Sequence, residues 1–335
     1  MKKSRMSLQD IASLAGLTKM TVSRYMRDPE MVSERSRQAI DAVMRRHDYI
    51  PNRLPDILSG ARSRTLGVII PSFRNQLFSD VLDGIQQVAA QYNYQTIIAS
   101  DNYDPLIGQQ KIITLLSYHI DALILTGRQH TQSAINSIRT SGVPVAELME
   151  ISHDALDIQV GFDSLQAARE MTRHLIARGR RQIVFLGAMD DPRDICRYRG
   201  VEMELTGAGL TGRHIVPKEI SSMALGQRMF RKIMQQYPQT DTIFCTNDDL
   251  AMGVLLECQA RQIAVPRQMA VAGFHGLDIG QANQQKLASV ITPRFRMGQL
   301  ATELLMDRLA GKQGRLAEQT SGIDLGYQLF FGDTV

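Results

Sequence analysis

The chain has 335 residues, which is too long for one ordinary domain and long enough for two or three. Hydrophobic residues make up 44% and charged residues 21%, a balance typical of a globular protein with well-filled cores. No stretch approaches the roughly 18 apolar residues of a membrane-spanning helix, and no apolar secretory segment follows Met1–Arg5. Three cysteines, Cys196, Cys245 and Cys258, cannot all pair and lack metal-ligand spacing, so we expect a protein of the reducing cytoplasm.

The positive charge is concentrated at the N-terminal end. Residues 1–65 contain 13 Lys and Arg against 7 Asp and Glu, whereas residues 66–335 contain 25 against 27. This asymmetry predicts a small basic module that meets a polyanion, followed by a nearly neutral module with a different task. A basic tail that served only solubility would lack the apolar pattern of the N-terminal segment.

Three short helices are predicted in the basic module. The apolar residues on one face of the first helix are Leu8, Ile11, Ala12 and Ala15. Gly16 ends this helix, Thr18 can cap a second helix, and Ser33 can cap a third. Two helices around a tight glycine turn, followed by a supporting helix, are typical of a helix-turn-helix DNA reader, although many three-helix bundles bind no DNA. In such a reader the second helix enters the major groove, so the residues expected to face DNA are Thr18, Lys19, Met20, Thr21, Ser23 and Arg24.

Two runs of residues in this module have a more specific pattern, one over 8–24 and one over 49–53. Both strongly resemble the lac repressor/galactose repressor family, and the resemblance extends over essentially the whole chain. Segments 75–78, 147–149, 245–249 and 273–276 look closest to the gluconate and idonate utilisation regulators. The resemblance implies a homodimeric transcription factor that binds a palindromic operator under the control of a small effector, with no cofactor and no membrane association. Pairing of dimers into tetramers is left open.

The segment 52–64 follows the third helix. Asn52 can cap a short helix from Arg53, and Pro55 would lie in its first turn, where a missing N–H costs little. A helix this short is unstable alone, so it should order only with DNA and the partner subunit. The resemblance implies a hinge helix in the minor groove with Leu58 wedged between base pairs, although Pro55 replaces the commoner alanine. The same residues also suit a flexible linker, and the two interpretations can apply to different states.

From residue 66 onward, buried strands alternate with amphipathic helices. Strands are predicted at 66–70, 95–99, 122–125 and 143–148, and again at 182–187, 241–246 and 269–274. Two such runs predict two similar parallel-sheet lobes with right-handed crossovers and a ligand at the carboxyl ends of the strands. The predicted fold is therefore an all-α helix-turn-helix domain (1–51), a hinge (52–64) and an α/β core of two doubly wound lobes (65–335). The resemblance implies the periplasmic sugar-binding fold, with chain crossings near Phe162, Thr292 and Ser321, an N-lobe of about 65–162 and 293–320, and a C-lobe of about 163–292 and 321–335.

Polar residues at the predicted strand ends are the candidate effector site. The resemblance assigns sugar-hydroxyl binding to Asn247 and a pocket role to Arg197, whose guanidinium can hold hydroxyls or a carboxylate bidentately. Asp248 suits capping of the next helix and contact with the ligand equally well, and Arg199 is expected to be a surface cation. Further residues expected at the pocket are Gln76 and Phe78 at its rim, and Thr126 and Asp163, which suit pocket lining and helix capping about equally.

Several positions depart from the family's neutral-sugar pattern. His275 stands where an aspartate is usual, and an aromatic residue is replaced near Ser221. Arg128 and His130 follow one strand end, and Glu147 and Glu150 flank another, although each of these alone is more often structural. Compared with the neutral-sugar pattern, the site lacks the anionic aspartate and has additional His and Arg residues. These changes favour a ligand that carries a carboxylate. We therefore expect a six-carbon sugar acid such as gluconate, idonate or a keto or phospho derivative.

Other classes of function fit less well. The sequence contains no nucleophile elbow, phosphate-cradling glycine loop, metal-ligand spacing or recognisable carboxylate pair, so no enzyme activity is expected. A soluble sugar-binding receptor would have the core fold but has no use for the basic module. A regulator of sugar-acid catabolism, most simply a repressor, is the prediction, and a response to a neutral sugar is the alternative.

Overall fold

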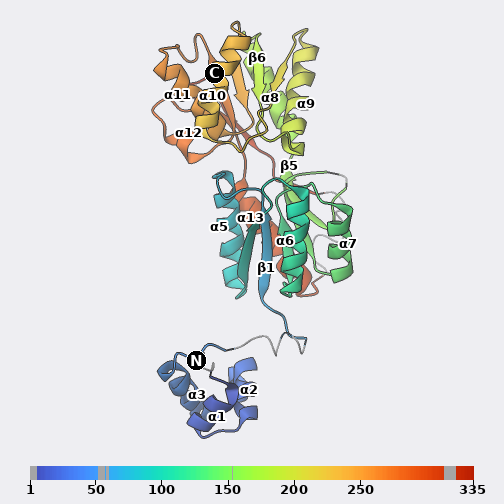
Figure 1. Cartoon of the computed structure of the whole chain (residues 1–335), viewed down its shortest axis with the longest axis vertical. Helices are drawn as coiled ribbons and strands as arrows, with labels where there is room; N and C mark the ends of the chain where they lie inside the picture. Colours follow the sequence, from blue (N-terminus) through green and yellow to red (C-terminus); the bar gives the residue numbers. More distant parts are fainter. Residues whose placement is uncertain (1–5, 52–56, 58–59, 153, 313–321) are drawn as a thin grey trace. The chain divides into compact units, whose positions relative to one another are not determined.

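The computed structural model describes residues 6–51, 57, 60–152, 154–312 and 322–335. The chain separates into two compact units, Met1–Ser63 and Arg64–Val335 (Figure 1). Among the described residues, no helix is long and apolar enough to cross a membrane.

The first unit contains helices α1 (Leu8–Ala15), α2 (Lys19–Arg27) and α3 (Glu34–Arg46), with a 3-10 turn at Pro29–Met31. Each helix begins where the sequence offers a cap. The Ser7 side chain accepts from the Asp10 N–H in a reciprocal capping box, the Thr18 side chain accepts from the Thr21 N–H, and Ser33 caps α3 in the same way. Gly16 ends α1 with φ +66°, a left-handed conformation that glycine adopts at little cost. The predicted capping by Thr18 and Ser33 is confirmed.

The core of this unit is small. Ile11, Ala12, Val22 and Ile40 are fully buried, and residues from all three helices surround them. Only Val22 is buried in α2, so most of that helix is available to solvent or to a partner. Helix α2 therefore contributes one fully buried side chain, Val22, to the core, and its polar side chains are left for contacts with solvent or a partner.

The second unit is built on two six-stranded sheets, in the orders β11-β5-β4-β3-β1-β2 and β12-β10-β9-β8-β6-β7. Every described pairing is parallel except that of β10 with β12. The strands of the first sheet are β1 (Thr65–Ile70), β2 (Gln95–Ser100), β3 (Ala122–Leu125), β4 (Val145–Glu150), β5 (Ile158–Phe162) and β11 (Ile323–Asp324). Those of the second are β6 (Ile183–Leu186), β7 (Arg213–Ile215), β8 (Thr242–Cys245), β9 (Ala270–His275), β10 (Ala288–Ile291) and β12 (Gln328–Phe330). The predicted fold class, a helical module followed by two parallel-sheet lobes, is confirmed.

Helices pack on each sheet to form a lobe. The N-lobe has α5 (Leu77–Gln91), α6 (Pro105–Ser117), α7 (Gln132–Ser141) and α13 (Arg294–Leu309). The C-lobe has α8 (Ser164–Ala177), α9 (Pro192–Gly207), α10 (Met223–Gln236), α11 (Asp248–Ala260) and α12 (Asp278–Ala282). The chain passes between lobes after Phe162 and between Ile291 and Arg294. The third passage follows Asp324, because β11 still pairs with β5 of the N-lobe sheet, and Ser321, near which this passage was expected, lies outside the described residues.

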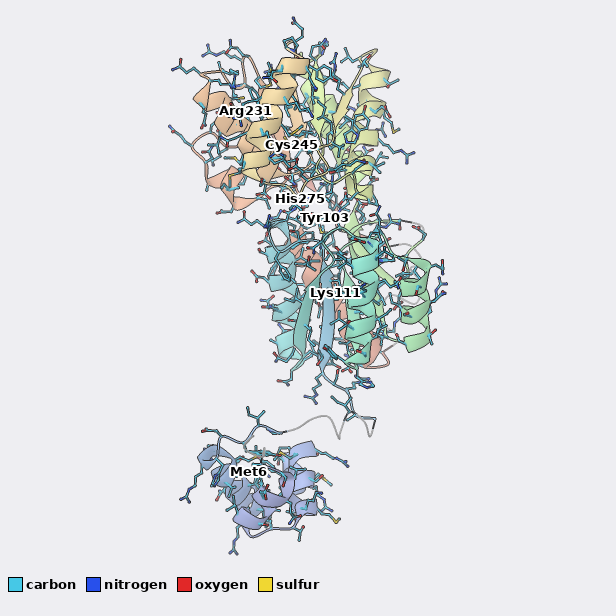
Figure 2. All side chains as sticks on the ribbon, viewed as in Figure 1. Met6, Tyr103, Lys111, Arg231, Cys245 and His275 are labelled. Atoms are coloured by element: carbon cyan, nitrogen blue, oxygen red, sulfur yellow. The ribbon has the colours of Figure 1, made fainter. Side chains whose placement is uncertain are left out.

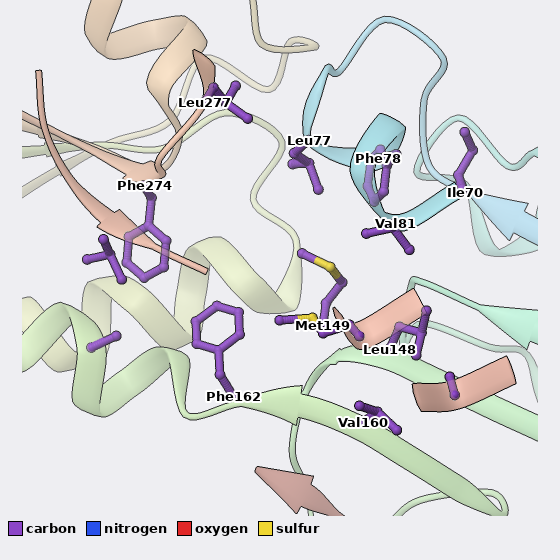
Figure 3. Packing of buried hydrophobic residues seen from close by; sticks show 14 of the residues in the cluster. Ile70, Leu77, Phe78, Val81, Leu148, Met149, Val160, Phe162, Phe274 and Leu277 are labelled. Carbon is purple, nitrogen blue, oxygen red and sulfur yellow. The ribbon is translucent and has the colours of Figure 1, made fainter. Parts of the chain in front are cut away.

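Apolar side chains join the two lobes where the chain crosses. Phe162 at the end of β5 lies 6.1 Å, ring centroid to centroid, from Phe274 of β9 (Figure 3). Met149 belongs to the same buried cluster (Figure 3). This continuous apolar contact aligns the carboxyl ends of both sheets and thereby positions the polar residues that follow them.

Candidate functional site

The first candidate surface is the N-terminal part of α2. Lys19 and Arg24 are exposed and Met20 is 73% exposed, whereas Thr21 and Ser23 are half-buried. The hydroxyls of Thr18 and Thr21 are 2.9 Å apart, so these two side chains also stabilise the start of the helix. The ammonium group of Lys19, the guanidinium of Arg24 and the thioether of Met20 are therefore available to contact base edges and phosphates.

Contacts with the supporting helix hold α2 in place. The Tyr25 hydroxyl of α2 donates a short hydrogen bond to the Asp41 carboxylate of α3. Burial, followed by this hydrogen bond to Asp41, raises the pKa of Tyr25 to about 12, so the phenol remains protonated and donating. The predicted hinge residues Asn52, Arg53 and Leu58 lie outside the described residues.

The second candidate site lies between the lobes. Two open cavities lie there, and because Tyr103, Asp191 and Arg193 line both, we call them together the interlobe cleft. Tyr103 and His275 lie where the two lobes meet (Figure 2). Further residues of the first cavity include Pro71, Asp101, Thr126, Arg128, Met149 and Glu150. Those of the second include Asn75, Leu77, Asp194, Arg197, Ser221, Thr246, Asn247 and His275.

Arg197 is the most deeply buried cation of the cleft, with 3% of its surface exposed. Its Nη1 donates to the carbonyl oxygen of Thr246 at 2.6 Å and its Nε to the hydroxyl of Ser164 at 3.3 Å. The guanidinium carbon lies 4.1 Å from the ring centroid of Phe274, a cation–π contact. Nη2 is buried and has no hydrogen-bond partner among the described residues. A buried donor without a partner carries a desolvation cost that an acceptor on a ligand would remove.

Arg193 lies one helical turn before Arg197 on α9. Its Nε and Nη2 both donate to one carboxylate oxygen of Asp191, at 3.1 and 2.7 Å. The guanidinium carbon also lies 5.8 Å from the ring centroid of Tyr103, which comes from the N-lobe. Arg193 therefore contacts groups of both lobes. Arg193 and Arg197 bring two positive charges to the cleft wall at the start of α9, and the carboxylates of Asp191, Asp194 and Glu150 line the same cleft.

Asp194 fixes the loop that leads into α9. One of its carboxylate oxygens accepts from the backbone N–H groups of Ala188, Met189 and Asp190, at 2.7, 3.0 and 3.3 Å. The other accepts a short hydrogen bond from the Thr246 hydroxyl. Four donors satisfy this carboxylate, which makes Asp194 a structural anchor for the wall of the cleft rather than a free acceptor.

Asn247 and Asp248 follow β8 and have different roles. The Asn247 side chain caps α11 by accepting from the Leu250 N–H at 3.1 Å, and its amide donates to the Ser221 hydroxyl at 2.6 Å. Asp248 is fully buried and accepts from the Leu277 N–H and the Ser289 hydroxyl. The prediction that Asp248 caps the helix or touches ligand is therefore wrong, because Asn247 is the cap and Asp248 points into the C-lobe.

His275 is the last residue of β9, is 1% exposed and lines the cleft. Its Nδ1 is 3.1 Å from the Thr292 hydroxyl on the passage to the N-lobe. Burial, with added repulsion from Arg197 and Arg294, lowers the pKa of His275 well below its usual value. The imidazole is thus neutral at neutral pH. His275 therefore removes the negative charge of the usual aspartate without adding a positive one, and the positive charges in the cleft belong to arginines.

Glu150 ends β4 and lines the cleft from the N-lobe side. It is 5% exposed, and its Oε1 has no hydrogen-bond partner among the described residues. Burial raises the pKa of Glu150, while Arg197 and Arg193 lower it in part. The preceding Met149 has φ +89°, a conformation that is rare for a residue with a side chain and that marks a constrained strand end.

Comparisons with known proteins agree with this geometry. A family pattern described as "Bacterial regulatory proteins, lacI family" matches residues 7–52, and one described as "Periplasmic binding proteins and sugar binding domain of LacI family" matches residues 63–325. The chain belongs to the LacI family. It is therefore a DNA-binding transcriptional regulator, and the resemblance seen in the sequence is confirmed.

Members of the LacI family resemble this chain over its whole length. The HTH-type transcriptional regulators IdnR and GntR of Escherichia coli K12 are 45% and 46% identical to it, with 100% of each chain covered. These relatives are transcriptional regulators rather than enzymes. A solved LacI-family regulator from Silicibacter pomeroyi has a TM-score of 0.91 at 30% identity and covers 98% of this chain and 99% of its own. The lac repressor dimer bound to operator shares the fold, with a TM-score of 0.82 at 21% identity over 99% of both chains.

The cleft of this LacI-family chain contains some of the residues expected from the sequence. Arg197, Asn247, His275, Thr126 and Arg128 line it. The Thr126 hydroxyl also donates to the Ile69 carbonyl, and an Arg128 nitrogen lies 2.6 Å from the Asp154 carboxylate. Both side chains thus have protein partners already.

Four other expected residues, Gln76, Phe78, Asp163 and Glu147, are not among those that line the two described cavities. Gln76 is exposed, and its neighbour Asn75 lines the cleft instead. Phe78 is buried in the N-lobe core, and Asp163 is exposed and caps α8. Glu147 accepts from the Leu156 N–H at 2.7 Å and does not line the described cavities.

Sequence reasoning did not identify Arg193, Asp191 or Tyr103. The run Asp190–Asp194 held a usable signal, because Asp191 and Pro192 are typical of a helix start and place Arg193 and Arg197 four residues apart on one face. No sequence signal pointed to Tyr103, because it lies in a turn, with φ +62°, and the direction of a turn side chain depends on tertiary contacts.

Proposed function

We propose that this LacI-family regulator is a homodimeric repressor of genes for sugar-acid catabolism. Its effector is a six-carbon sugar acid, such as gluconate, idonate or a keto or phospho derivative, bound in the interlobe cleft. Binding closes the lobes and changes how the hinge, residues 52–64, docks on a palindromic operator. The relatives IdnR and GntR support gluconate or idonate as the effector.

The observation that carries the effector proposal is the unpartnered Nη2 of Arg197 inside the cleft. A ligand carboxylate there would accept a hydrogen bond from a guanidinium that protein contacts already hold in place. Such a charge-assisted hydrogen bond is stronger than a neutral one, and the low dielectric of a buried site strengthens it further. Arg193 lies beside it and adds positive charge. Asn247, Ser221 and Tyr103 offer amide and hydroxyl groups for the remaining hydroxyls of the ligand.

The residue at 275 supports the same choice. An aspartate there would repel an acid, whereas a neutral imidazole does not. The neutral-sugar alternative relies on the amide and hydroxyl groups of Asn247, Ser221 and Tyr103, and these groups serve a sugar acid equally well.

The DNA-binding surface supports a dimer on an inverted repeat. One recognition helix presents only a few side chains, which are too few to specify a site in a genome, so two copies are needed. We propose that Lys19 and Met20 face bases and that Arg24 contacts a base or an adjacent phosphate. A duplex that carries one half-site should bind far more weakly than the palindrome, and the affinity should fall steeply with salt.

The experiment that tests the proposed effector is a thermal-shift screen of the full chain, followed by calorimetry. Gluconate, idonate and 5-ketogluconate are compared with glucitol and glucose, which lack the carboxylate. An effector at about 100 times its Kd stabilises the folded state by about 2.7 kcal/mol, enough for a clear rise in Tm. Stabilisation by the acids alone supports the proposal. Stabilisation by a neutral sugar and not by the acids would contradict it.

A further inference from the structure

Arg294 connects the two lobes beside the interlobe cleft. It is the first residue of α13, directly after the passage from β10, and is 8% exposed. Its Nε and Nη2 donate to one carboxylate oxygen of Asp80 on α5, at 3.0 and 2.5 Å. Its Nη1 donates a short hydrogen bond to the backbone carbonyl of His275. One guanidinium thus joins a helix of the N-lobe to the end of a C-lobe strand.

We propose that Arg294 is the positioning residue that couples the interlobe cleft to the helix pair α5–α13. The proposal rests on the proposed function, in which an effector in the cleft changes operator binding. Arg294 does not line the described cavities, so its part is to transmit a change at His275 rather than to bind the effector.

His275 forms the C-lobe end of this connection and also lines the cleft. His275 has φ +96°, a conformation that few non-glycine residues adopt, and it is held there by contacts on two sides. His275 lines the cleft, its Nδ1 lies 3.1 Å from the Thr292 hydroxyl, and its carbonyl accepts from Arg294. A ligand that moves the ring or the end of β9 therefore changes the direction of the carbonyl that Arg294 holds.

The N-lobe end of this connection is the closely packed helix pair α5 and α13. Helices α5 and α13 cross at two glycines, where a methyl group on Gly84 would lie 2.2 Å from the Phe295 carbonyl oxygen and one on Gly298 would lie 2.1 Å from that of Val81. The backbones are therefore in close contact, so we expect a displacement of one helix to carry the other with it. Helices α5 and α13 pack against each other in the N-lobe (Figure 1), so a shift of Arg294 or Asp80 is expected to act on both.

The connection requires an arginine. A planar guanidinium can donate to a carboxylate through one pair of N–H groups and to a carbonyl through another at the same time. A lysine at this position would keep the charge near Asp80 but would not reach both acceptors. The variant Arg294→Lys therefore separates the bridging role from a plain ion pair.

The first experiment uses the full chain without effector. Hydrogen–deuterium exchange is measured for the parent, Arg294→Lys and the control Arg296→Lys, whose parent residue lies on the same helix and pairs with Glu303 at the surface. Loss of a charge-assisted hydrogen bond should speed local opening near residues 275–278 and the start of α5 by roughly tenfold or more in Arg294→Lys. The control should exchange like the parent. Equal exchange in the two variants would overturn the proposal.

The second experiment measures coupling. The operator affinity of each variant is determined without effector and with gluconate at a concentration that calorimetry shows to be saturating. In Arg294→Lys and in Asp80→Asn, the change in operator affinity caused by gluconate should shrink by roughly fivefold or more, a sizeable part of a typical allosteric coupling. An undiminished response in both variants would overturn the proposal. Failure of the parent to bind any sugar acid would contradict the proposed effector alone, and the exchange result would then decide the role of Arg294.

Discussion

Replacement of Arg197 by lysine is the sharpest test of the charge selectivity of the cleft. In the parent, Arg197 donates to Thr246 and Ser164 and covers the Phe274 ring, which leaves Nη2 for a ligand. A lysine ammonium is a compact point charge without the planar fork, so it can retain a contact with the Thr246 carbonyl but cannot also present a fixed second donor. Arg197→Lys thus removes the ligand-facing donor and keeps the formal charge.

The size of the effect follows from the kind of hydrogen bond that is lost. A hydrogen bond to a charged group contributes about 1.5–3 kcal/mol, whereas one between neutral partners contributes about 0.5–1.5 kcal/mol. At about 1.4 kcal/mol for each factor of ten, gluconate affinity should fall roughly 10- to 150-fold. Glucitol, which has a hydroxymethyl group in place of the carboxylate, should lose only about 2- to 10-fold.

Titration calorimetry with both ligands measures the two losses separately. Arg199→Lys is the matched control, because Arg199 lies on the same helix and is exposed. It should leave both affinities as in the parent. Equal losses for gluconate and glucitol in Arg197→Lys would show that the guanidinium binds hydroxyls, and the reasoning from its unpartnered Nη2 would be refuted.

Three further changes have definite expected outcomes. His275→Asp should lower gluconate affinity at least roughly tenfold, about 1.4 kcal/mol, and glucitol affinity far less; equal losses by calorimetry would make His275 a packing residue. Leu58→Ala should weaken operator binding in a gel-shift assay and leave effector affinity intact, and full operator affinity would remove the intercalated leucine from the mechanism. Burial raises the pKa of Asp248 to about 7. The stability that this group contributes is present below pH 4 and is lost as pH rises through 7. From pH 5 to 7.5 the parent should therefore lose on the order of 2 kcal/mol in urea unfolding relative to Asp248→Asn, and parallel pH profiles would contradict this.

Local sequence rules predicted the helix-turn-helix module well. Capping by Thr18 and Ser33 and the turn at Gly16 depend on residues three or four positions apart, so tertiary structure adds little to them. The strand ends were predictable for a different reason. Parallel strands bring their carboxyl ends to one edge, so polar residues at these ends were expected at the cleft, and the family resemblance then singled out Asn247 and His275 among them.

Predictions were less accurate where one residue of register or one contact decides the outcome. Gln76 has helical backbone angles at the start of α5, and its side chain is exposed, whereas Asn75 before it is buried and lines the cleft. The charge state of His275 could not be predicted either. It depends on burial and on the cations around it, and Arg294 is 19 residues away in sequence.

Glu150 gives the last prediction, because it places a buried acid beside the arginines that would hold the carboxylate of an effector. A bound carboxylate favours the protonated form of Glu150, so above the raised pKa of this group binding must take up a proton. Gluconate affinity should therefore fall as pH rises through that pKa, by at most roughly tenfold per pH unit for one proton. Calorimetry between pH 5 and pH 8 should show this slope in the parent and a flat profile in Glu150→Gln. Glu147→Gln is the control, since Glu147 is also buried with a raised pKa but does not line the described cavities, and it should keep the slope of the parent. If Glu150→Gln kept the slope instead, the proton would belong to another group, and Glu150 would not be the acid that adjusts the charge of the cleft.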